Sequence, residues 1–264
     1  MFTLGIVGCG YLAHIITNEL LNGALPDYKL VGAMSRTPEK AEFIANKING
    51  ANLDYSCQAF SNIDDLLAIK PDFIIETASL TGFKEFAVKA LKNGSSIVTL
   101  SIGAFADKEF YEEVAKTAKE NNTRVYIASG AIGGFDVLRT ATLMGNSKVT
   151  FSTEKNPRPL RYTPLHSDDL AVTKKEVFRG TATEAIALLP TQVNVSVAAS
   201  IASVGPDNVG VDITSTPGFV GDRHVIKIKN DQVDAVIDVY SSTPEIAGWS
   251  VIETLQNITS PIVF

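Results

Sequence analysis

A short apolar strand that breaks into a glycine turn lies at the start of the chain, and it constrains the fold more than any other feature. Leu4–Val7 is apolar, Gly8–Ala13 reads Gly-Cys-Gly-Tyr-Leu-Ala, and an amphipathic helical stretch follows. Gly8 permits a tight turn, Gly10 has no Cβ to keep the backbone away from a phosphate, and Ala13 lets the helix pack close to the strand. That helix would present its free N–H groups to the phosphate. Strand, glycine turn and helix in this order predict a dinucleotide-binding βαβ unit rather than a plain structural turn. The residues expected at the cofactor are Gly8, Gly10, Tyr11, Leu12 and Ala13.

The composition is that of a globular protein of one or two domains. The chain has 264 residues, of which 45% are hydrophobic and 20% charged, with a net charge of −6. An acidic balance without a Lys/Arg run argues against a nucleic-acid or anionic-membrane partner. Cys9 and Cys57 are the two cysteines, which makes a disulfide framework improbable and favours a reducing cytoplasm. The apolar N-terminal stretch is too short for a signal peptide or a membrane span.

The first half of the chain alternates short β-branched runs with helical stretches. Thr37-Pro38 and Asp107 are typical helix starts. The alternation predicts an α/β Rossmann-type domain with a parallel sheet. Strands are expected at Thr3–Val7, Lys29–Met34, Phe73–Thr77, Ser96–Leu100 and Val125–Ala128. Helices are expected at Ala13–Asn22, Pro38–Asn49, Ile63–Ala68, Gly82–Asn93 and Asp107–Asn121.

The second half predicts an inserted α+β domain with an open, mixed or largely antiparallel sheet. We expect a dinucleotide-binding domain over 1–129 and 240–264, and a substrate domain over 130–239. Strands are expected at Val149–Thr153, Val209–Ser215, His224–Ile228 and Ala235–Val239, and helices at Phe135–Leu143, Thr183–Leu188, Val193–Ser203 and Gly248–Ile258.

The end of the second strand indicates which dinucleotide binds. An NAD site usually has an acidic residue there, which accepts hydrogen bonds from the ribose hydroxyls. This chain has Ser35, Arg36 and Thr37 instead. Hydroxyls and a guanidinium suit a 2′-phosphate, which predicts NADP(H) in preference to NAD(H). The alternative is that Arg36 is a solvated loop residue.

Two later loops are expected to contact the same cofactor. Thr77, Ala78 and Ser79 follow one predicted strand and would pass the nicotinamide-side ribose. Ala104, within Ser101–Phe105, follows the next strand and would lie near the nicotinamide ring. Ordinary strand-to-helix turns are an equally good interpretation of any single one of these residues.

Three histidines are the first candidates for acid–base chemistry. His14 lies in the first helix, where a packing role is the usual one, and His166 lies in a polar loop. His224 opens an apolar strand. No spacing of these histidines with the cysteines suggests zinc, and no G-x-S-x-G elbow suggests a serine hydrolase.

Five segments, in the same order along the whole chain, resemble the L-aspartate dehydrogenase family. They are Gly8-Cys9-Gly10, Ser101–Asp107, Ser129–Asp136 (Ser-Gly-Ala-Ile-Gly-Gly-Phe-Asp), Val193-Asn194-Val195 and His224. The resemblance implies a Rossmann domain formed by the first half and the last helix, with an inserted α+β domain. It also implies oxidation of L-aspartate to iminoaspartate with NAD(P)⁺.

The resemblance assigns roles to residues of the second half. His224 matches the catalytic histidine, expected to position substrate and act as general acid/base. The turn at Gly130, Ala131, Ile132 and Gly133 would offer backbone N–H groups to the substrate's α-carboxylate. Asn194 would contact the nicotinamide carboxamide.

Departures from the family pattern lie near the histidine. Thr216-Pro217 stands where the family has Asp-Pro, Asp222 where it has Asn, and Ser241–Pro244 where it tends to read Asn-Pro-x-Thr-Ser. A dicarboxylate substrate needs cationic anchors. The candidates are Lys155, Arg158, Arg161 and Arg223.

The leading hypothesis is an NAD(P)-dependent amino-acid dehydrogenase acting on aspartate or a relative. The alternatives are an NADP-dependent imine or carbonyl reductase acting on a different small substrate, and a non-catalytic NADP(H)-binding sensor. By analogy, an open inserted sheet favours a homodimer.

Overall fold

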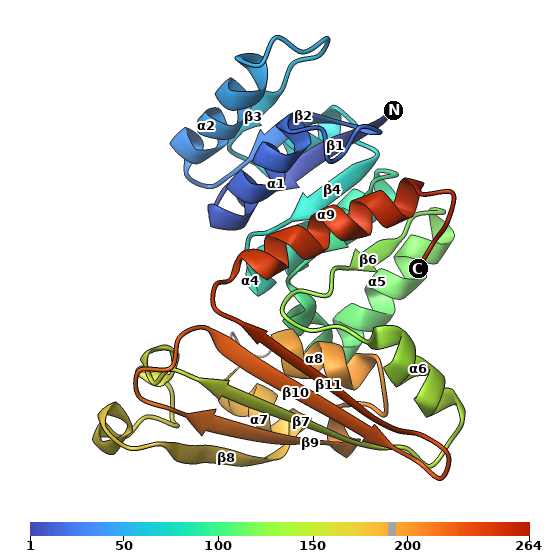
Figure 1. The fold of residues 1–264 in the computed structure, drawn as a ribbon. Coiled ribbons are helices and arrows are strands. Elements are labelled where there is room, and N and C mark those ends of the chain that lie inside the picture. Colours follow the sequence, from blue (N-terminus) through green and yellow to red (C-terminus); the bar gives the residue numbers. More distant parts are fainter. Residues whose placement is uncertain (190–193) are drawn as a thin grey trace. The chain divides into compact units, whose positions relative to one another are not determined.

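The computed structural model describes residues 1–189 and 194–264 (Figure 1). Two compact units make up the chain, Met1–Ala128 with Ala247–Phe264, and Ser129–Ile246. The second unit ends later than residue 239, because the strand that begins at Asp234 continues through Ser241. None of the helices in the described ranges is long and apolar enough to cross a membrane.

The first unit contains a six-stranded parallel sheet in the order β3-β2-β1-β4-β5-β6. Its central strands read as apolar runs because helices cover both faces. The order places the start of the chain in the middle of the sheet, next to β4. The strands are β1 (Phe2–Val7), β2 (Tyr28–Met34), β3 (Gln58–Phe60), β4 (Phe73–Glu76), β5 (Ser96–Thr99) and β6 (Val125–Ile127).

The helices of the first unit begin at recognisable caps. Asn62, Ser79 and Asp107 each accept a backbone N–H with the side chain, as N-cap residues do. Thr37 occupies an N-cap position before Pro38 but makes no such bond. The helices are α1 (Tyr11–Leu21), α2 (Pro38–Asn49), α3 (Ile63–Ala68), α4 (Leu80–Lys92), the 3₁₀ turn η1 (Ile102–Ala106), α5 (Lys108–Glu120) and α9 (Glu245–Thr259).

Helix α9 completes the core of the first unit. Val251, Ile252 and Leu255 join the buried cluster that also contains residues of β1 and α1. Gly248 packs against Ile15, where an added Cβ would lie 3.3 Å from that side chain. The Tyr28 hydroxyl donates a 2.7 Å hydrogen bond to the Leu255 carbonyl. Residues from the two ends of the chain thus form one hydrophobic core.

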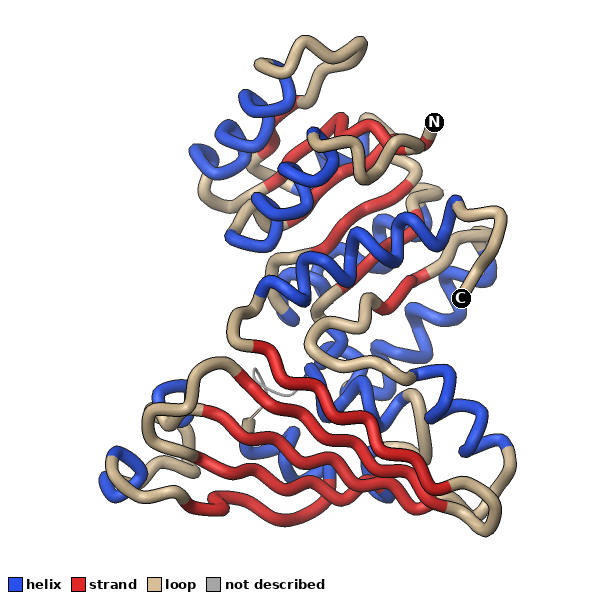
Figure 2. The backbone as a smooth tube through the Cα atoms, in the orientation of Figure 1, coloured by secondary structure: helices blue, strands red, loops and turns tan. Residues whose placement is uncertain are grey.

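The second unit contains a five-stranded sheet in the order β11-β10-β7-β9-β8. Its strands lie side by side in Figure 2. Strands β7 and β9 pair in parallel and the other three pairs are antiparallel, so the sheet is mixed. The parallel pair follows from the helical crossover between these strands. The strands are β7 (Lys148–Lys155), β8 (Lys175–Thr181), β9 (Val209–Ser215), β10 (Asp222–Lys229) and β11 (Asp234–Ser241).

One face of this second sheet is buried and the other is solvated. Val149, Phe151, Val211 and Ile226 belong to the buried face, and the residues between them are partly or fully exposed. The remaining elements of the unit are α6 (Phe135–Leu143), η2 (Arg158–Leu160), η3 (Asp168–Ala171), α7 (Ala182–Leu188), α8 (Asn194–Ile201) and η4 (Pro206–Asn208).

Candidate functional site

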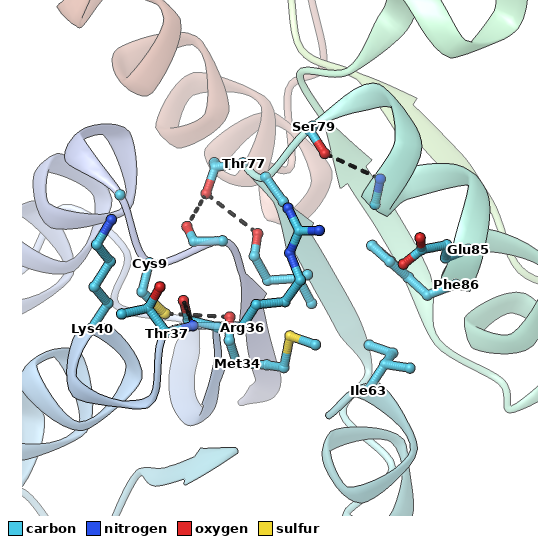
Figure 3. A pocket seen from close by; sticks show the side chains of 16 residues that line it. Cys9, Met34, Arg36, Thr37, Lys40, Ile63, Thr77, Ser79, Glu85 and Phe86 are labelled. Carbon is cyan, nitrogen blue, oxygen red and sulfur yellow. Dashed lines mark hydrogen bonds between the residues drawn. The ribbon is translucent and has the colours of Figure 1, made fainter. Parts of the chain in front are cut away.

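A pocket of about 280 Å³ lies in the first unit at the glycine turn (Figure 3). Its wall is formed by the ends of β1, β2 and β4 and by the residues that follow them, which is where nucleotides bind in open parallel sheets. The lining residues are Val7, Gly8, Cys9, Gly10, Met34, Ser35, Arg36, Thr37, Lys40, Ile63, Thr77, Ala78, Ser79, Gly82, Glu85 and Phe86.

Glycine stands at positions 8 and 10 of the turn for different reasons. Gly8 has a φ of +94°, and an added Cβ would lie 2.6 Å from the Cα of Ala78. Gly10 has an extended backbone, and its added Cβ would meet nothing within 4 Å. Gly8 is therefore required by the fold, whereas the space over Gly10 is open to a ligand. This open backbone at the start of α1 fits a dinucleotide phosphate.

The first turn of α1 contributes to the site through the backbone rather than through buried side chains. Ala13 is fully buried and packs in the core, so its side chain supports the helix and does not reach the pocket. Tyr11 is exposed, and neither Tyr11 nor Leu12 lines the pocket. Ala104 is buried in η1 and also lies outside the lining.

The end of β2 presents hydroxyls and cations to the pocket. Ser35 is buried, and its Oγ accepts a 3.1 Å hydrogen bond from the backbone N–H of Thr37. Arg36 and Lys40 both line the pocket (Figure 3), and Lys40 lies in the first turn of α2. Lys40 was not anticipated from the sequence, although it lies only four residues after Arg36. The carboxylate in the lining, Glu85, comes from α4 and not from β2.

A buried carboxylate ties together the two loops expected at the nicotinamide half of the cofactor. Glu76 accepts hydrogen bonds from the Ala78 N–H at 2.7 Å and from the Thr99 hydroxyl at 2.6 Å. It also accepts bonds from Ser101, from the hydroxyl at 2.9 Å and from the backbone N–H at 3.1 Å. Burial raises the pKa of Glu76 above its ordinary value, while these bonds act to lower that pKa. The sequence signal was an acidic residue ending an apolar strand.

His224 is buried near the start of β10 in the second unit. Its ring stacks on Phe151 with centroids 5.7 Å apart, and it pairs in register with Thr153 of β7. Burial, and secondarily the charge of Lys155, lowers the pKa of His224 to about 4, against which Asp222 acts weakly. The imidazole is therefore neutral at pH 7.

Three buried side-chain polar atoms have no hydrogen-bond partner among the residues the structure describes, and they come from adjacent strands. They are the Nδ1 of His224, the Oγ1 of Thr153 and the Oγ of Ser215. Buried polar groups are nearly always paired in folded proteins. The three atoms lie on the buried face of β9, β7 and β10, at one end of the sheet.

Of the cations proposed as substrate anchors, Lys155 lies on this face. It pairs in register with Ser215 on β9 and with Asp222 on β10. Burial lowers the pKa of Lys155 below its ordinary value, partly offset by Asp222. Asp222 acts on Lys155 through its charge and not through a hydrogen bond.

The other proposed anchors lie elsewhere. Arg223 is on the outward face, where its Nε donates to Asp238 at 2.9 Å. Arg158 and Arg161 are exposed in the loop after β7. Thr216, which departs from the family pattern, donates its hydroxyl to Glu154 at 2.6 Å.

The second glycine turn leads into α6. Gly130 and Gly134 have φ values of +64° and +71°, and Gly134 is the N-cap of the helix. An added Cβ on Gly134 would lie 2.5 Å from Ile237 of β11, so the turn packs directly on the sheet. Ile132 is buried, whereas an added Cβ on Gly133 would meet nothing within 4 Å.

The remaining candidate residues are His14, His166 and Asn194. His14 packs on Phe43 with ring centroids 4.9 Å apart, and His166 lies in an exposed loop 3.7 Å from Asp168. Asn194 begins α8, while Val193 lies outside the described residues.

In the described ranges there is no group of three residues suited to a metal ion. Cys9 and Cys57 are free and buried, and burial raises the pKa of each thiol to about 12.

The parallel sheet with its glycine-turn pocket, joined to a second unit that buries a neutral histidine, defines a dehydrogenase of the nicotinamide-dinucleotide-binding class. Family models agree: residues 8–128 match the NAD-binding domain of homoserine dehydrogenase, and residues 136–258 match the C-terminal domain of aspartate dehydrogenase. The chain belongs to the L-aspartate dehydrogenase family.

Relatives support this assignment over the full length. The L-aspartate dehydrogenases of Methanococcus maripaludis strain C7 and of Methanosarcina mazei are each 31% identical, covering 99% of this chain and 98% of theirs. The structure of aspartate dehydrogenase from Thermotoga maritima matches with a TM-score of 0.77 at 24% identity, covering 100% and 99% of the two chains. A hyperthermophilic archaeal homoserine dehydrogenase in complex with NADPH shares the fold, with a TM-score of 0.65, 14% identity and coverage of 100% and 99%.

Proposed function

We propose that the protein is an NAD(P)-dependent dehydrogenase that oxidises the CH–NH₂ group of L-aspartate, or runs the reverse reaction. Oxidation gives iminoaspartate, which water converts to oxaloacetate and ammonia. Relatives that are named L-aspartate dehydrogenase and match over 99% of the chain support L-aspartate as the substrate. The observation that carries the chemistry is the unpartnered Nδ1 of the buried, neutral His224.

His224 acts as the general base in this proposal. It accepts a proton from the α-ammonium of aspartate, which leaves a neutral amine whose lone pair assists departure of the hydride from Cα. When bound, the nicotinamide cofactor accepts that hydride. In the reverse direction the protonated imidazole returns its proton to the amine.

The substrate and the nicotinamide carboxamide have further proposed contacts. Backbone N–H groups of the turn Gly130–Gly133, together with the start of α6, hold the α-carboxylate. Asn194 contacts the carboxamide. Glu76 keeps the loops around Ala78 and Ser101 in position for the cofactor.

The preferred cofactor in this proposal is NADP(H), with NAD(H) also accepted. The pocket lining contains the hydroxyls of Ser35 and Thr37 and the two cations Arg36 and Lys40. The end of β2 carries no carboxylate to repel a 2′-phosphate. Michaelis constants for NADPH and NADH under identical conditions test the preference, and values equal or in favour of NADH contradict it.

The activity is tested by following absorbance at 340 nm while NADPH, ammonia and oxaloacetate are mixed with the protein. We expect consumption of NADPH that the His224→Asn change abolishes. His166→Asn removes an exposed histidine and is the matched control. Tight binding of NADPH without turnover across a panel of keto acids would support a sensor, and turnover of other keto or imine substrates alone would support a different reductase.

A homodimer is also proposed, by analogy with other inserted open sheets. The outward face of the second sheet carries ion pairs such as Arg223–Asp238 and Arg179–Asp212, so a partner seated there would meet a polar surface. Light scattering coupled to gel filtration distinguishes a dimer from a monomer.

A further inference from the structure

We propose that Lys155, with the hydroxyls of Thr153 and Ser215, forms a subsite beside His224 that binds the side-chain carboxylate of a dicarboxylic amino acid. The inference rests on the proposed function and names how that site selects its substrate. It starts from the three unpartnered buried polar atoms, which all lie on the face where Lys155 also lies.

Strand register brings these groups together. His224 pairs with Thr153, and two residues along the same strands Asp222 pairs with Lys155. Lys155 also pairs with Ser215 on the other side. Paired residues share a face of the sheet, and positions two apart on a strand are separated by roughly 7 Å. The ammonium, both hydroxyls and the imidazole therefore surround one small region.

The chemistry of the region fits a carboxylate. The ammonium of Lys155 and the two hydroxyls have hydrogens to donate, and neither hydroxyl has a hydrogen-bond partner among the residues that the structure describes. A ligand that accepts hydrogen bonds from all of these donors must have several lone pairs and a negative charge. Asp222 lies opposite Lys155 and limits the charge that the region attracts, which favours a singly charged carboxylate over a doubly charged phosphate.

The glycine turn lies on the opposite side of His224. Gly134 contacts Ile237, which is two residues from Val239, the β11 partner of His224. Lys155 is two residues from Thr153, the β7 partner of His224. Along the sheet the order is therefore glycine turn, His224, Lys155. A substrate with its amine at His224 and carboxylates on both sides is a short dicarboxylic amino acid.

Succinate tests the subsite without turnover, because it has both carboxylates and no amine. We expect Lys155→Met to weaken succinate binding by calorimetry at pH 7 by roughly 10–100-fold, the range for a lost charged hydrogen bond. Lys155→Arg should retain part of the affinity. Lys227→Met is the matched control, since Lys227 is exposed on the outward face of β10.

Two further measurements separate binding from a merely structural role. In the absence of ligand, Lys155→Met should raise the pKa of His224 measured by NMR of its imidazole, because a facing cation is removed. Thr153→Val with Ser215→Ala should weaken succinate binding while leaving the melting temperature equal or higher, because the buried hydroxyls lack partners in the fold. This double variant keeps the test decisive if Lys155→Met does not fold.

The outcomes separate this inference from the proposed function. Unchanged succinate affinity in Lys155→Met or in the double variant overturns the subsite, as does an unchanged pKa of His224. Lys155-dependent succinate binding in a protein that does not turn over oxaloacetate and ammonia supports the subsite and overturns the proposed reaction. Turnover with a KM for oxaloacetate that does not depend on Lys155 overturns the subsite alone.

Discussion

Gly8 and Ala78 meet at the carboxyl ends of β1 and β4 so closely that any side chain on Gly8 would overlap the Ala78 backbone. An added Cβ would lie 2.6 Å from both the nitrogen and the Cα of Ala78. The Thr77 hydroxyl reinforces the approach with a 2.7 Å hydrogen bond to the Gly8 carbonyl. This contact fixes the glycine turn relative to the loop after β4.

The two glycines of the turn predict two different defects. Gly8→Ala should destabilise the protein by about 1–3 kcal/mol or more, because the alanine would have a positive φ and its Cβ would overlap the Ala78 backbone. Gly10→Ala should leave the melting temperature of the cofactor-free protein unchanged and weaken NADPH binding, because its Cβ enters open space. Thermal unfolding and fluorescence titration with NADPH measure the two effects. Equal loss of stability in both variants would contradict the assignment.

Arg36 and Lys40 should set the selectivity for the cofactor. Arg36→Ala or Lys40→Ala should raise the Michaelis constant for NADPH by roughly 10–100-fold, the effect of one charged hydrogen bond, and leave that for NADH nearly unchanged. Steady-state kinetics with both cofactors measure this, with Lys92→Ala on the exposed end of α4 as control. An equal rise in the Michaelis constants for NADPH and NADH would show that the two cations do not contact the 2′-phosphate.

Burial of neutral His224 should make the protein sensitive to acid. The pKa is about 4 in the folded state against an ordinary 6.5, so the unfolded chain binds the proton more readily. The stabilisation is complete above about pH 6.5 and is lost as the pH falls toward about 4, an effect of about 3 kcal/mol. Urea unfolding at a series of pH values should show a flatter dependence for His224→Asn. His166→Asn should behave like the parent protein.

Replacing the Glu76 carboxylate should disturb both stability and cofactor binding. In Glu76→Gln one oxygen becomes an NH₂ group facing either Ala78 N–H or Ser101 N–H, which leaves a donor unpaired at a cost of about 1–3 kcal/mol. Calorimetric unfolding and the KM for NADPH report the two consequences. Glu109→Gln on the exposed face of α5 is the control, and identical behaviour of the two variants would argue against a positioning role for Glu76.

Helices and strands could be predicted where the spacing of apolar residues and the position of turn residues indicate the same bounds. The bounds of α2, α3, α6 and β9 are confirmed as expected, because each begins or ends at a turn residue next to a clear apolar period. Two strands were missed. Strand β3 has three residues and too little length for alternation, and the register of β8 shifts between Glu176 and Phe178, which breaks its period of two.

The candidate site was predictable only where a residue type is informative by itself. Glycine, arginine and histidine stand out in a sequence, and Gly8, Arg36 and His224 were identified from the turn, the strand end and the family resemblance. Thr153 and Ser215 did not stand out, because a hydroxyl on a strand gains meaning only from the register that places it. Glu76 depends on long-range contacts to Thr99 and Ser101 in the same way.

The position of α9 has a consequence for biosynthesis. Ile15 and Tyr28 emerge early from the ribosome, but their partners Gly248 and Leu255 are translated only after all of Ser129–Ile246. The dinucleotide-binding unit therefore cannot close its core while the second unit is being made, although domains generally fold as they emerge. During that interval the apolar surface that Val251, Ile252 and Leu255 cover in the folded unit stays exposed.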